Sequence, residues 1–391
     1  MALVSLDGGE VDAGAASLLR DYHVGNVIHF GNNVADFGSA RRLNAELDGI
    51  IRENCAGVPP LVSVDHEGGR VMRFGAGFTW FPSQMALGAA DDEALTEAVG
   101  RAMGAELRAA GFNLSFSPVL DVLRRGSPGF VGIRAFGASP DAAARHGAAM
   151  ARGLQGAGVM ACAKHFPGHG DTEADSHYGL PKVDKPREAL DAMELRPYRG
   201  LVGESAADAV MTTHILFPAL EPRDVPATMS EATVTGVLRG DLGFTGMVVT
   251  DGMQMGAIAA HYGMARGCVE AVKAGCDLLA VGTGGAGSRD AQAACLEAVY
   301  RAVLQGEIPM ERIDGAVARI LRLKEKYCGP WEMSGGDTSH ETSRDRLTEE
   351  MPGGDTSHGA SRADPPHGIS GGSASREPAP PVPTASRSHP A

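Results

Sequence analysis

Polar side chains that could act on a substrate stand directly after several short apolar runs of this sequence. Asp251 follows residues 247–250, and Lys164 and His165 follow residues 159–163. A carboxylate can serve as a nucleophile, and a histidine can move a proton near neutral pH. A lone Asp after a strand is more often the N-cap of the next helix. Polar groups, however, follow five such runs, at Asp65, Asp121, Lys164 with His165, His214 and Asp251. Their number favours a catalytic or binding site.

The elements that would position these groups are eight short runs rich in β-branched and apolar residues. They alternate with Ala-, Leu-, Glu- and Arg-rich stretches of helical spacing, which predicts repeated β-α units and a parallel sheet. The runs are residues 2–6, 24–30, 60–64, 112–116, 159–163, 209–213, 247–250 and 277–281. Eight such units close a (β/α)8 TIM-type barrel, in which chemistry takes place at the carboxyl ends of the strands. The predicted α/β fold therefore brings the polar groups to one face.

The composition changes near residue 330. The segment EMSGGDTSH at residues 332–340 recurs as EMPGGDTSH at residues 350–358, within a stretch rich in Gly, Ser, Pro and Thr. Such a stretch has too few apolar residues to offset the entropy lost on ordering. We therefore expect one catalytic barrel domain at residues 1–330 and a disordered low-complexity tail at residues 331–391.

Charge and cysteine usage limit the possible partners. The 391 residues include 35 Lys and Arg against 48 Asp and Glu, a net charge of −13, without a basic cluster of the kind that follows a phosphate backbone. The apolar runs are far shorter than the about 18 residues that a membrane helix needs, and no secretory signal is visible. Six cysteines without a C-x-x-C pair are typical of reduced thiols. These features predict a cytoplasmic protein without nucleic-acid or membrane partners.

One long motif is similar to a known family signature. Residues 164–181, KHFPGHGDTEADSHYGLP, resemble the signature of glycoside hydrolase family 3, in its β-N-acetylhexosaminidase branch. The resemblance continues, in the family's order, through DHEGGRVMR at 65–73, FSPVLD at 116–121, RAFG at 134–137, MTTH at 211–214 and VTDGMQM at 249–255. It covers roughly residues 3–326 and implies the same barrel fold, here without the additional domain that some members have.

The resemblance implies three catalytic residues. Asp251 would be the nucleophile that attacks the anomeric carbon and forms a glycosyl-enzyme intermediate in a retaining double displacement. His177, with Asp175 as its partner, would be the general acid/base, a role that suits an imidazole with an ordinary pKa near 6.5. Gly252 departs from the family, in which a polar residue usually follows the nucleophile.

The resemblance also assigns the sugar-binding residues. Carboxylates and cations hold the hydroxyls of a bound ring, and the matching positions are Asp65, Arg73, Arg134, Lys164 and His165.

Two neighbours of Asp65 have other expected roles. Glu67 lies two residues further along and would point to the same side, where we expect it to position a basic ligand of the sugar. His66 replaces the Gln that the family usually has, and we expect it to face the other way.

Together these features predict a retaining exo-β-N-acetylglucosaminidase. It would release terminal β-linked GlcNAc from small glycans such as muropeptides or chito-oligosaccharides, in cell-wall recycling, as a monomer without a cofactor or metal. The sequence does not identify a residue that by itself recognises the 2-acetamido group, so β-glucoside activity stays open. Relatives usually have a helix before the first strand, so an upstream start with a targeting segment is the alternative to a cytoplasmic location.

Three other functions stay open at this point. A phosphorylase of the same family would use phosphate in place of water, since a histidine acid does not repel that anion. A non-catalytic sugar-binding barrel would keep Asp65 and Lys164. A metal-dependent amidohydrolase would bind zinc through some of the residues His165, His169, His177, His214 and Asp251.

Overall fold

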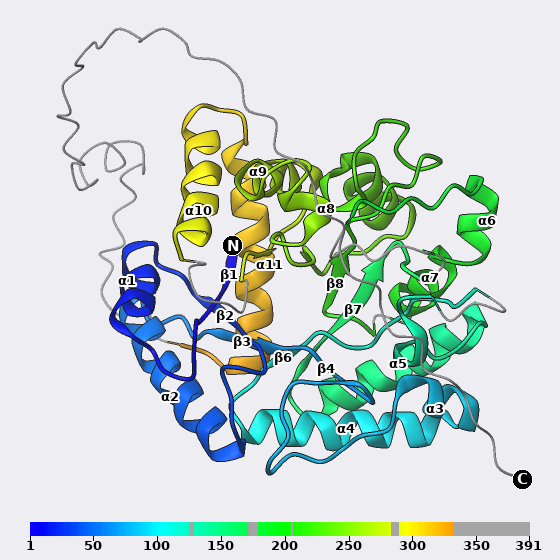
Figure 1. Cartoon of the computed structure of the whole chain (residues 1–391), viewed down its shortest axis with the longest axis horizontal. Coiled ribbons are helices and arrows are strands. Elements are labelled where there is room, and N and C mark those ends of the chain that lie inside the picture. The colour runs from blue at the N-terminus through cyan, green and yellow to red at the C-terminus, as the bar shows by residue number, and fades with distance from the viewer. Residues whose placement is uncertain (125–128, 171, 173–178, 205, 283–288, 332–391) are drawn as a thin grey trace, which may run out of the picture. The chain divides into compact units, whose positions relative to one another are not determined.

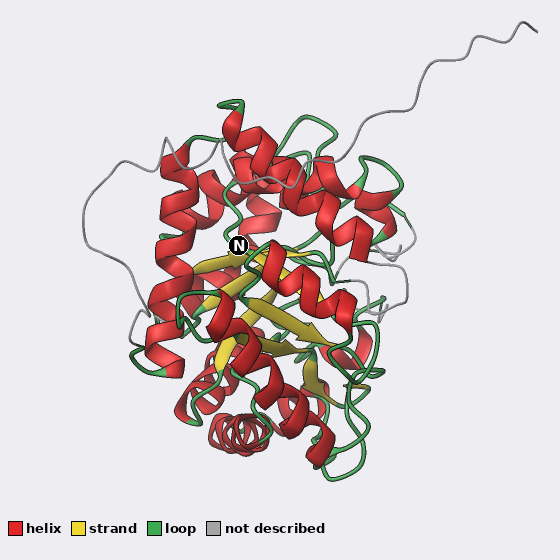
Figure 2. Ribbon diagram, turned by 90° about the vertical axis from the view of Figure 1, so that its left-hand side faces the viewer, coloured by secondary structure: helices red, strands yellow, loops and turns green. Residues whose placement is uncertain are grey.

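The computed structural model describes residues 1–124, 129–170, 172, 179–204, 206–282 and 289–331. Eight parallel strands form a barrel that helices surround (Figure 1; Figure 2). The strands are β1 Ala2–Ser5, β2 Asn26–His29, β3 Leu61–Val64, β6 Leu114–Ser115, β7 Met160–Phe166, β8 Ala209–Thr212, β9 Met247–Val249 and β10 Leu279–Ala280. Each lies in or overlaps one of the eight predicted runs, which confirms the predicted (β/α)8 fold. The predicted tail, Asp175 and His177 lie outside the described residues.

The strand order is β10-β1-β2-β3-β6-β7-β8-β9. A parallel bridge between Val249 and Leu278 joins the two ends of this order, so the sheet closes on itself. A small antiparallel hairpin, β4 His66–Gly68 and β5 Val71–Met72, follows β3. Because the strands are parallel, the polar residues that end them lie near one mouth of the barrel.

The helices that pack around the strands begin at residues suited to capping. Ser83, Asp92 and Ser139 each accept a hydrogen bond from a backbone N–H in the first turn of the following helix, and Asp36 forms a capping box with Ser39. The helices are α1 Ala13–Asp21, α2 Phe37–Asn54, α3 Gln84–Ala90, α4 Glu93–Ala109, α5 Pro140–Gly156, α6 Arg187–Ala192, α7 Leu195–Gly203, α8 Gly256–Ala259, α9 Met264–Ala274, α10 Arg289–Leu304 and α11 Met310–Cys328. Short 3-10 turns lie at Gly132–Arg134 and Ala227–Met229, and a π-helical segment spans Ala232–Asp241. None of the described helices is both long and apolar enough to cross a membrane.

Apolar side chains fill the barrel interior below its carboxyl end. Alternate strand residues such as Leu3, Leu114 and Met247 point inward and are fully buried. At the amino-terminal end, Ile320 and Tyr327 of α11 pack against this interior cluster. The helix is held there by contacts to residues that precede strands, among them the hydrogen bond from Lys324 to the Gly25 carbonyl.

A buried carboxylate ties α11 to the strands at the same end. Asp277, which has no solvent exposure, pairs with Arg239 at 2.6 Å, Arg312 at 3.1 Å and Arg319 at 3.2 Å. Its Oδ2 atom also accepts the Val248 N–H at 2.9 Å. Three cations therefore depend on one carboxylate.

Asp277→Ala is expected to lower the free energy of unfolding by about 3–5 kcal/mol, because it leaves three partly buried guanidinium groups without their carboxylate. Urea unfolding measures the difference. Asp191→Ala is the matched control: Asp191 also pairs with two arginines, Arg187 and Arg199, but on the surface, so its loss should be below about 1 kcal/mol. Similar small losses in both variants would contradict a structural role for Asp277.

Candidate active site

A cavity of about 210 Å³ opens at the carboxyl ends of the strands. Most of the predicted site residues line it: Asp65, Arg73, Arg134, Lys164, His165 and Asp251. They come from elements as far apart in sequence as β3 and β9. The fold therefore brings together the described part of the predicted site, as its strand-end positions suggest.

Lys164 is the buried cation at the centre of the site. Its side chain is only 2% exposed, and Nζ lies 2.7 Å from Asp65 Oδ1 and 2.6 Å from Glu67 Oε1. Burial acts to lower the pKa of Lys164, but the two carboxylates outweigh burial and raise it above its ordinary value. The ammonium group therefore stays charged and can donate to a ligand oxygen.

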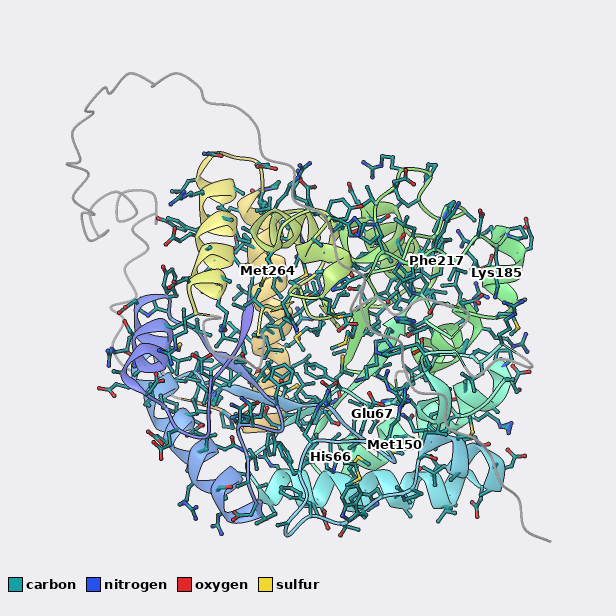
Figure 3. The ribbon with its side chains drawn as sticks, in the orientation of Figure 1. His66, Glu67, Met150, Lys185, Phe217 and Met264 are labelled. Carbon is teal, nitrogen blue, oxygen red and sulfur yellow. The ribbon has the colours of Figure 1, made fainter. Side chains whose placement is uncertain are left out.

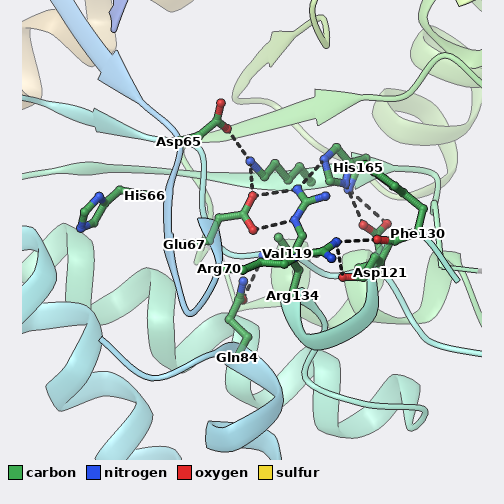
Figure 4. A network of polar contacts seen from close by, with 12 residues as sticks. Asp65, His66, Glu67, Arg70, Gln84, Val119, Asp121, Phe130, Arg134 and His165 are labelled. Carbon is green, nitrogen blue, oxygen red and sulfur yellow. Dashed lines mark hydrogen bonds and ion pairs between the residues drawn. The ribbon is translucent and has the colours of Figure 1, made fainter. Parts of the chain in front are cut away.

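Glu67 holds both central cations in place. Besides Lys164, it accepts two hydrogen bonds from Arg134, from Nε to Oε2 and from Nη2 to Oε1, each 2.8 Å long (Figure 4). Burial acts to raise the pKa of Glu67, but the two cations outweigh it and lower the pKa. This geometry confirms the expectation that Glu67 positions basic residues. It also means that Arg134 is already oriented before a sugar binds.

Asp65 is the carboxylate of the site best placed to accept from sugar hydroxyls. It is 18% exposed, and it pairs with Lys164 through one oxygen and with Arg73 through the other, at 3.2 Å. Burial acts to raise the pKa of Asp65, but Lys164 and Arg73 hold it well below its usual range. The group is ionised at neutral pH and keeps lone pairs for a ligand.

Lys164 and His165 lie within β7 and not after it, so the predicted end of this strand at residue 163 is wrong. The register between β7 and β8 shifts between Ala163 and Phe166. Such an irregularity interrupts the usual alternation of side chains. Two successive residues, Lys164 and His165, can therefore both line the cavity.

Asp121 orients His165 from behind. Its Oδ2 lies 2.7 Å from His165 Nδ1, and its Oδ1 accepts the His169 N–H at 2.7 Å. Burial acts to raise the pKa of Asp121, but interaction with His165 outweighs it, and the pKa falls to about 2. Because Nδ1 donates to this carboxylate, Nε2 is free to accept from Arg134, 3.3 Å away. The sequence predicted Asp121 only as a polar group at a strand end, and the structure shows that it positions His165.

Asp251 follows β9 and lies at the cavity wall. Its Oδ1 accepts the Gly252 N–H at 2.7 Å. Burial acts to raise the pKa of Asp251, but His165, His214 and this hydrogen bond outweigh it and lower the pKa below its ordinary value. His214 steadies the segment through a contact of 3.0 Å from Nε2 to the Gly252 carbonyl. Asp251 is therefore a fixed, ionised carboxylate, as a nucleophile requires.

His66 points away from the cavity, as expected. Its ring stacks on Phe74 and also contacts Phe78 and Phe81, and it lies on the opposite side of the chain from Glu67 (Figure 3; Figure 4). Burial lowers its pKa to about 4. His66 is therefore a neutral core residue.

Several cavity residues were not anticipated from the sequence. One wall is apolar and comes from the ends of β2, β8 and β10 and the segment after β9; its members are Ile28, Phe30, Met211, Met255 and Ala280. Arg70, Phe130 and Gln254 also line the cavity. Gln254 lies inside the motif at 249–255, and Phe30 and Met211 lie near the ends of predicted strands. Their position near a strand end was the one feature of the sequence that could have indicated them as cavity residues.

The zinc hypothesis finds no support among the described residues. They contain no group of three or more His, Cys, Asp and Glu side chains arranged to hold a metal. His165 is bound to Asp121, His169 to Thr172 and His214 to Thr228. His177 lies outside the described residues.

A barrel that presents an ionised carboxylate at one strand end, opposite a network of carboxylates and cations suited to hydroxyl groups, has the features of a carbohydrate-cleaving enzyme. The model of the glycosyl hydrolase family 3 N-terminal domain matches residues 2–323. The chain belongs to glycoside hydrolase family 3, whose enzymes act on O-glycosyl bonds.

Named relatives and solved structures agree with this family. A β-hexosaminidase of Tolumonas auensis is 37% identical over 281 residues, covering 71% of this chain and 81% of the relative. A family 3 β-N-acetylglucosaminidase from Paenibacillus sp. str. FPU-7 is 42% identical with a TM-score of 0.80, covering 88% of this chain and 64% of that one. The chain thus spans less than two thirds of the Paenibacillus enzyme. NagZ from Neisseria gonorrhoeae, in complex with N-trifluoroacetyl-D-glucosamine, is 30% identical with a TM-score of 0.66, covering 83% of this chain and 97% of that one.

Proposed function

We propose that this protein is a retaining exo-β-N-acetylglucosaminidase that hydrolyses terminal β-linked GlcNAc through a glycosyl-enzyme intermediate. The observation that carries the proposal is Asp251, an ionised carboxylate fixed at the wall of a cavity that holds hydroxyl-binding groups. The relatives named β-hexosaminidase and β-N-acetylglucosaminidase support the choice of sugar.

The described residues would have the following roles in substrate binding and hydrolysis. Asp65 accepts hydrogen bonds from adjacent hydroxyls of the ring, while Lys164, Arg134 and His165 donate to or contact its other oxygens. Asp251 then attacks the anomeric carbon, the bond from this carbon to the leaving oxygen breaks, and the leaving oxygen takes a proton from the general acid/base. In the second step a water molecule, deprotonated by the same acid/base, releases the sugar from Asp251.

A histidine is the acid/base that best fits this cavity. Among the described residues, the other carboxyls that line it are Asp65 and Glu67, and both have a pKa below the ordinary value because they pair with cations. They are ionised at neutral pH and have no proton to donate to a leaving group. His177, with Asp175 as its partner, therefore remains our candidate from the sequence motif.

The substrate that we propose is a small glycan with a terminal β-GlcNAc, such as a peptidoglycan fragment. We further propose that the protein acts in the cytoplasm, as a monomer, in the recycling of the cell wall.

A phosphorylase is the second candidate function. Arg70 lines the cavity, and among the described residues its hydrogen bonds go to the carbonyl oxygens of Phe130 and Val131 alone. No carboxylate of the described residues therefore neutralises its charge, and an incoming phosphate would be attracted to it.

The test is release of nitrophenol from aryl β-GlcNAc and aryl β-glucoside, each with and without phosphate. Faster turnover of the GlcNAc substrate, with free GlcNAc as product, supports the hydrolase. Sugar 1-phosphate and acceleration by phosphate support the phosphorylase. No turnover of either substrate would leave the sugar-binding barrel as the better description.

The pH dependence of kcat/KM should identify the acid/base. Asp251 must be ionised, and because its pKa lies below the ordinary value of about 3.8, it should not limit activity above about pH 4. The acid must carry a proton, so activity should be present below its pKa and fall as pH rises through it, near 6.5 for an unperturbed histidine. His177→Ala should remove this alkaline limb. An unchanged limb in that variant would exclude His177.

A further inference from the structure

Gly252, which departs from the family pattern directly after the nucleophile, lies beneath the side chain of Gln254. A Cβ atom at position 252 would be only 2.5 Å from Gln254 Nε2 and 2.8 Å from Oε1. The carboxamide of Gln254 therefore occupies the space that a side chain at position 252 would take. A polar group is therefore present beside Asp251.

The carboxamide has an unused acceptor. Gln254 lines the cavity together with Asp251 and Gly252, yet its Oε1 atom is buried and has no hydrogen-bond donor in the described part of the chain. Burying an amide oxygen without a donor is unfavourable. The terminal torsion of Gln is soft, so small rotations can turn this oxygen toward a ligand. Gln254 Oε1 would therefore gain a hydrogen-bond partner when a ligand with a donor binds in the cavity.

The position of this acceptor relates it to one part of the sugar. Asp251 must face the anomeric carbon, and the 2-substituent is attached to the next ring atom. The other neighbour of the anomeric carbon is the ring oxygen, which has no N–H or O–H to donate, so the donor for a group beside Asp251 would come from the 2-substituent. Met211 and Met255, both 5% exposed, belong to the apolar wall of the same cavity. An acetamido group offers a fixed N–H donor and a methyl group, which match an amide acceptor and an apolar wall.

We propose that Gln254 is the residue that recognises the 2-acetamido group, with its carboxamide accepting the N–H and the Met211 and Met255 wall receiving the methyl. The inference rests on the proposed function and names the residue that selects GlcNAc over glucose. A glucoside depends less on Gln254, because its 2-hydroxyl can rotate its proton toward another acceptor such as Asp251. An amide N–H is fixed in direction and is left unpaired when the acceptor is removed.

The test compares kcat/KM for aryl β-GlcNAc and aryl β-glucoside in wild type, Gln254→Met and Gln305→Met. Methionine keeps the length of the side chain but has no strong acceptor. We expect the ratio of the two kcat/KM values to fall about 10- to 100-fold in Gln254→Met, with a matching rise in the inhibition constant of free GlcNAc relative to glucose. Gln305, exposed at the end of α10, provides the matched control, whose ratio should not change.

The outcomes separate this inference from the proposed function. If wild type prefers GlcNAc but Gln254→Met lowers both activities equally, or neither, Gln254 does not read the acetamido group. If wild type has no preference for GlcNAc, the proposed function itself is wrong. A second variant, Gly252→Ala, tests the same point without removing the amide: its Cβ would displace the carboxamide, and the ratio should fall in the same direction.

Discussion

Asp251→Ala is expected to lower kcat for aryl β-GlcNAc hydrolysis by on the order of 10⁴-fold. Alanine has no atom that can form the bond to the anomeric carbon, and the Gly252 N–H loses the carboxylate that it binds at 2.7 Å. Asp65, Lys164 and Arg134 keep their own partners, so KM should change far less than kcat. Initial rates of nitrophenol release measure both constants.

An added nucleophile gives a sharper test of the role of Asp251. Azide is small enough to use the space that the carboxylate leaves, and it should restore turnover of Asp251→Ala with an α-glycosyl azide as product. Wild type should release the β-anomer first, as retention requires, and proton NMR distinguishes the two. Asp184→Ala removes a surface carboxylate that is 72% exposed and should leave the rate within about twofold of wild type. A rate for Asp251→Ala within tenfold of wild type would show that another group is the nucleophile.

Lys164→Met should reduce kcat/KM by about 10²- to 10³-fold and the free energy of unfolding by about 3–5 kcal/mol. Lys164 is 2% exposed and lies within 2.7 Å of both Asp65 and Glu67. Without it, two neighbouring carboxylates share a buried site and repel each other. Sugar binding loses a donor, and Asp65 loses the partner that orients it. Steady-state kinetics and urea unfolding measure the two effects.

The loss of stability in Lys164→Met should depend on pH. In wild type the pKa values of Asp65 and Glu67 lie below their ordinary values, so their ion pairs contribute stability above about pH 4 and lose it as the pH falls further. In the variant both pKa values should rise, and protonation then relieves the buried charge. The difference between the two proteins should therefore shrink from pH 7 to pH 4. Equal differences at both pH values would contradict this account.

Lys182→Met is the control for the charge itself. Lys182 pairs with Asp184 on the surface, where the two side chains are 49% and 72% exposed. Such a pair contributes less than about 1 kcal/mol, so this variant should unfold almost as wild type does at both pH values.

The barrel could be predicted because its evidence is local in the sequence. Each strand is a short apolar or β-branched run, and the polar residue at its end can be identified without knowledge of any other strand. Asp65 and Asp251 were found in this way, and parallel pairing then placed both at the same mouth of the barrel. The end of β7 was missed because a register shift at Ala163 to Phe166 depends on its neighbour β8.

The sequence by itself thus determined the fold class, the family and most of the charged residues that meet in the cavity. Only the tertiary structure decided how they are paired: Asp121 binds His165 across 44 positions, and Glu67 joins Lys164 to Arg134. It also showed that Gln254 takes the space left by Gly252. Periodicity and strand ends are properties of neighbouring residues, whereas these contacts arise between side chains that only the closed barrel brings within hydrogen-bond distance.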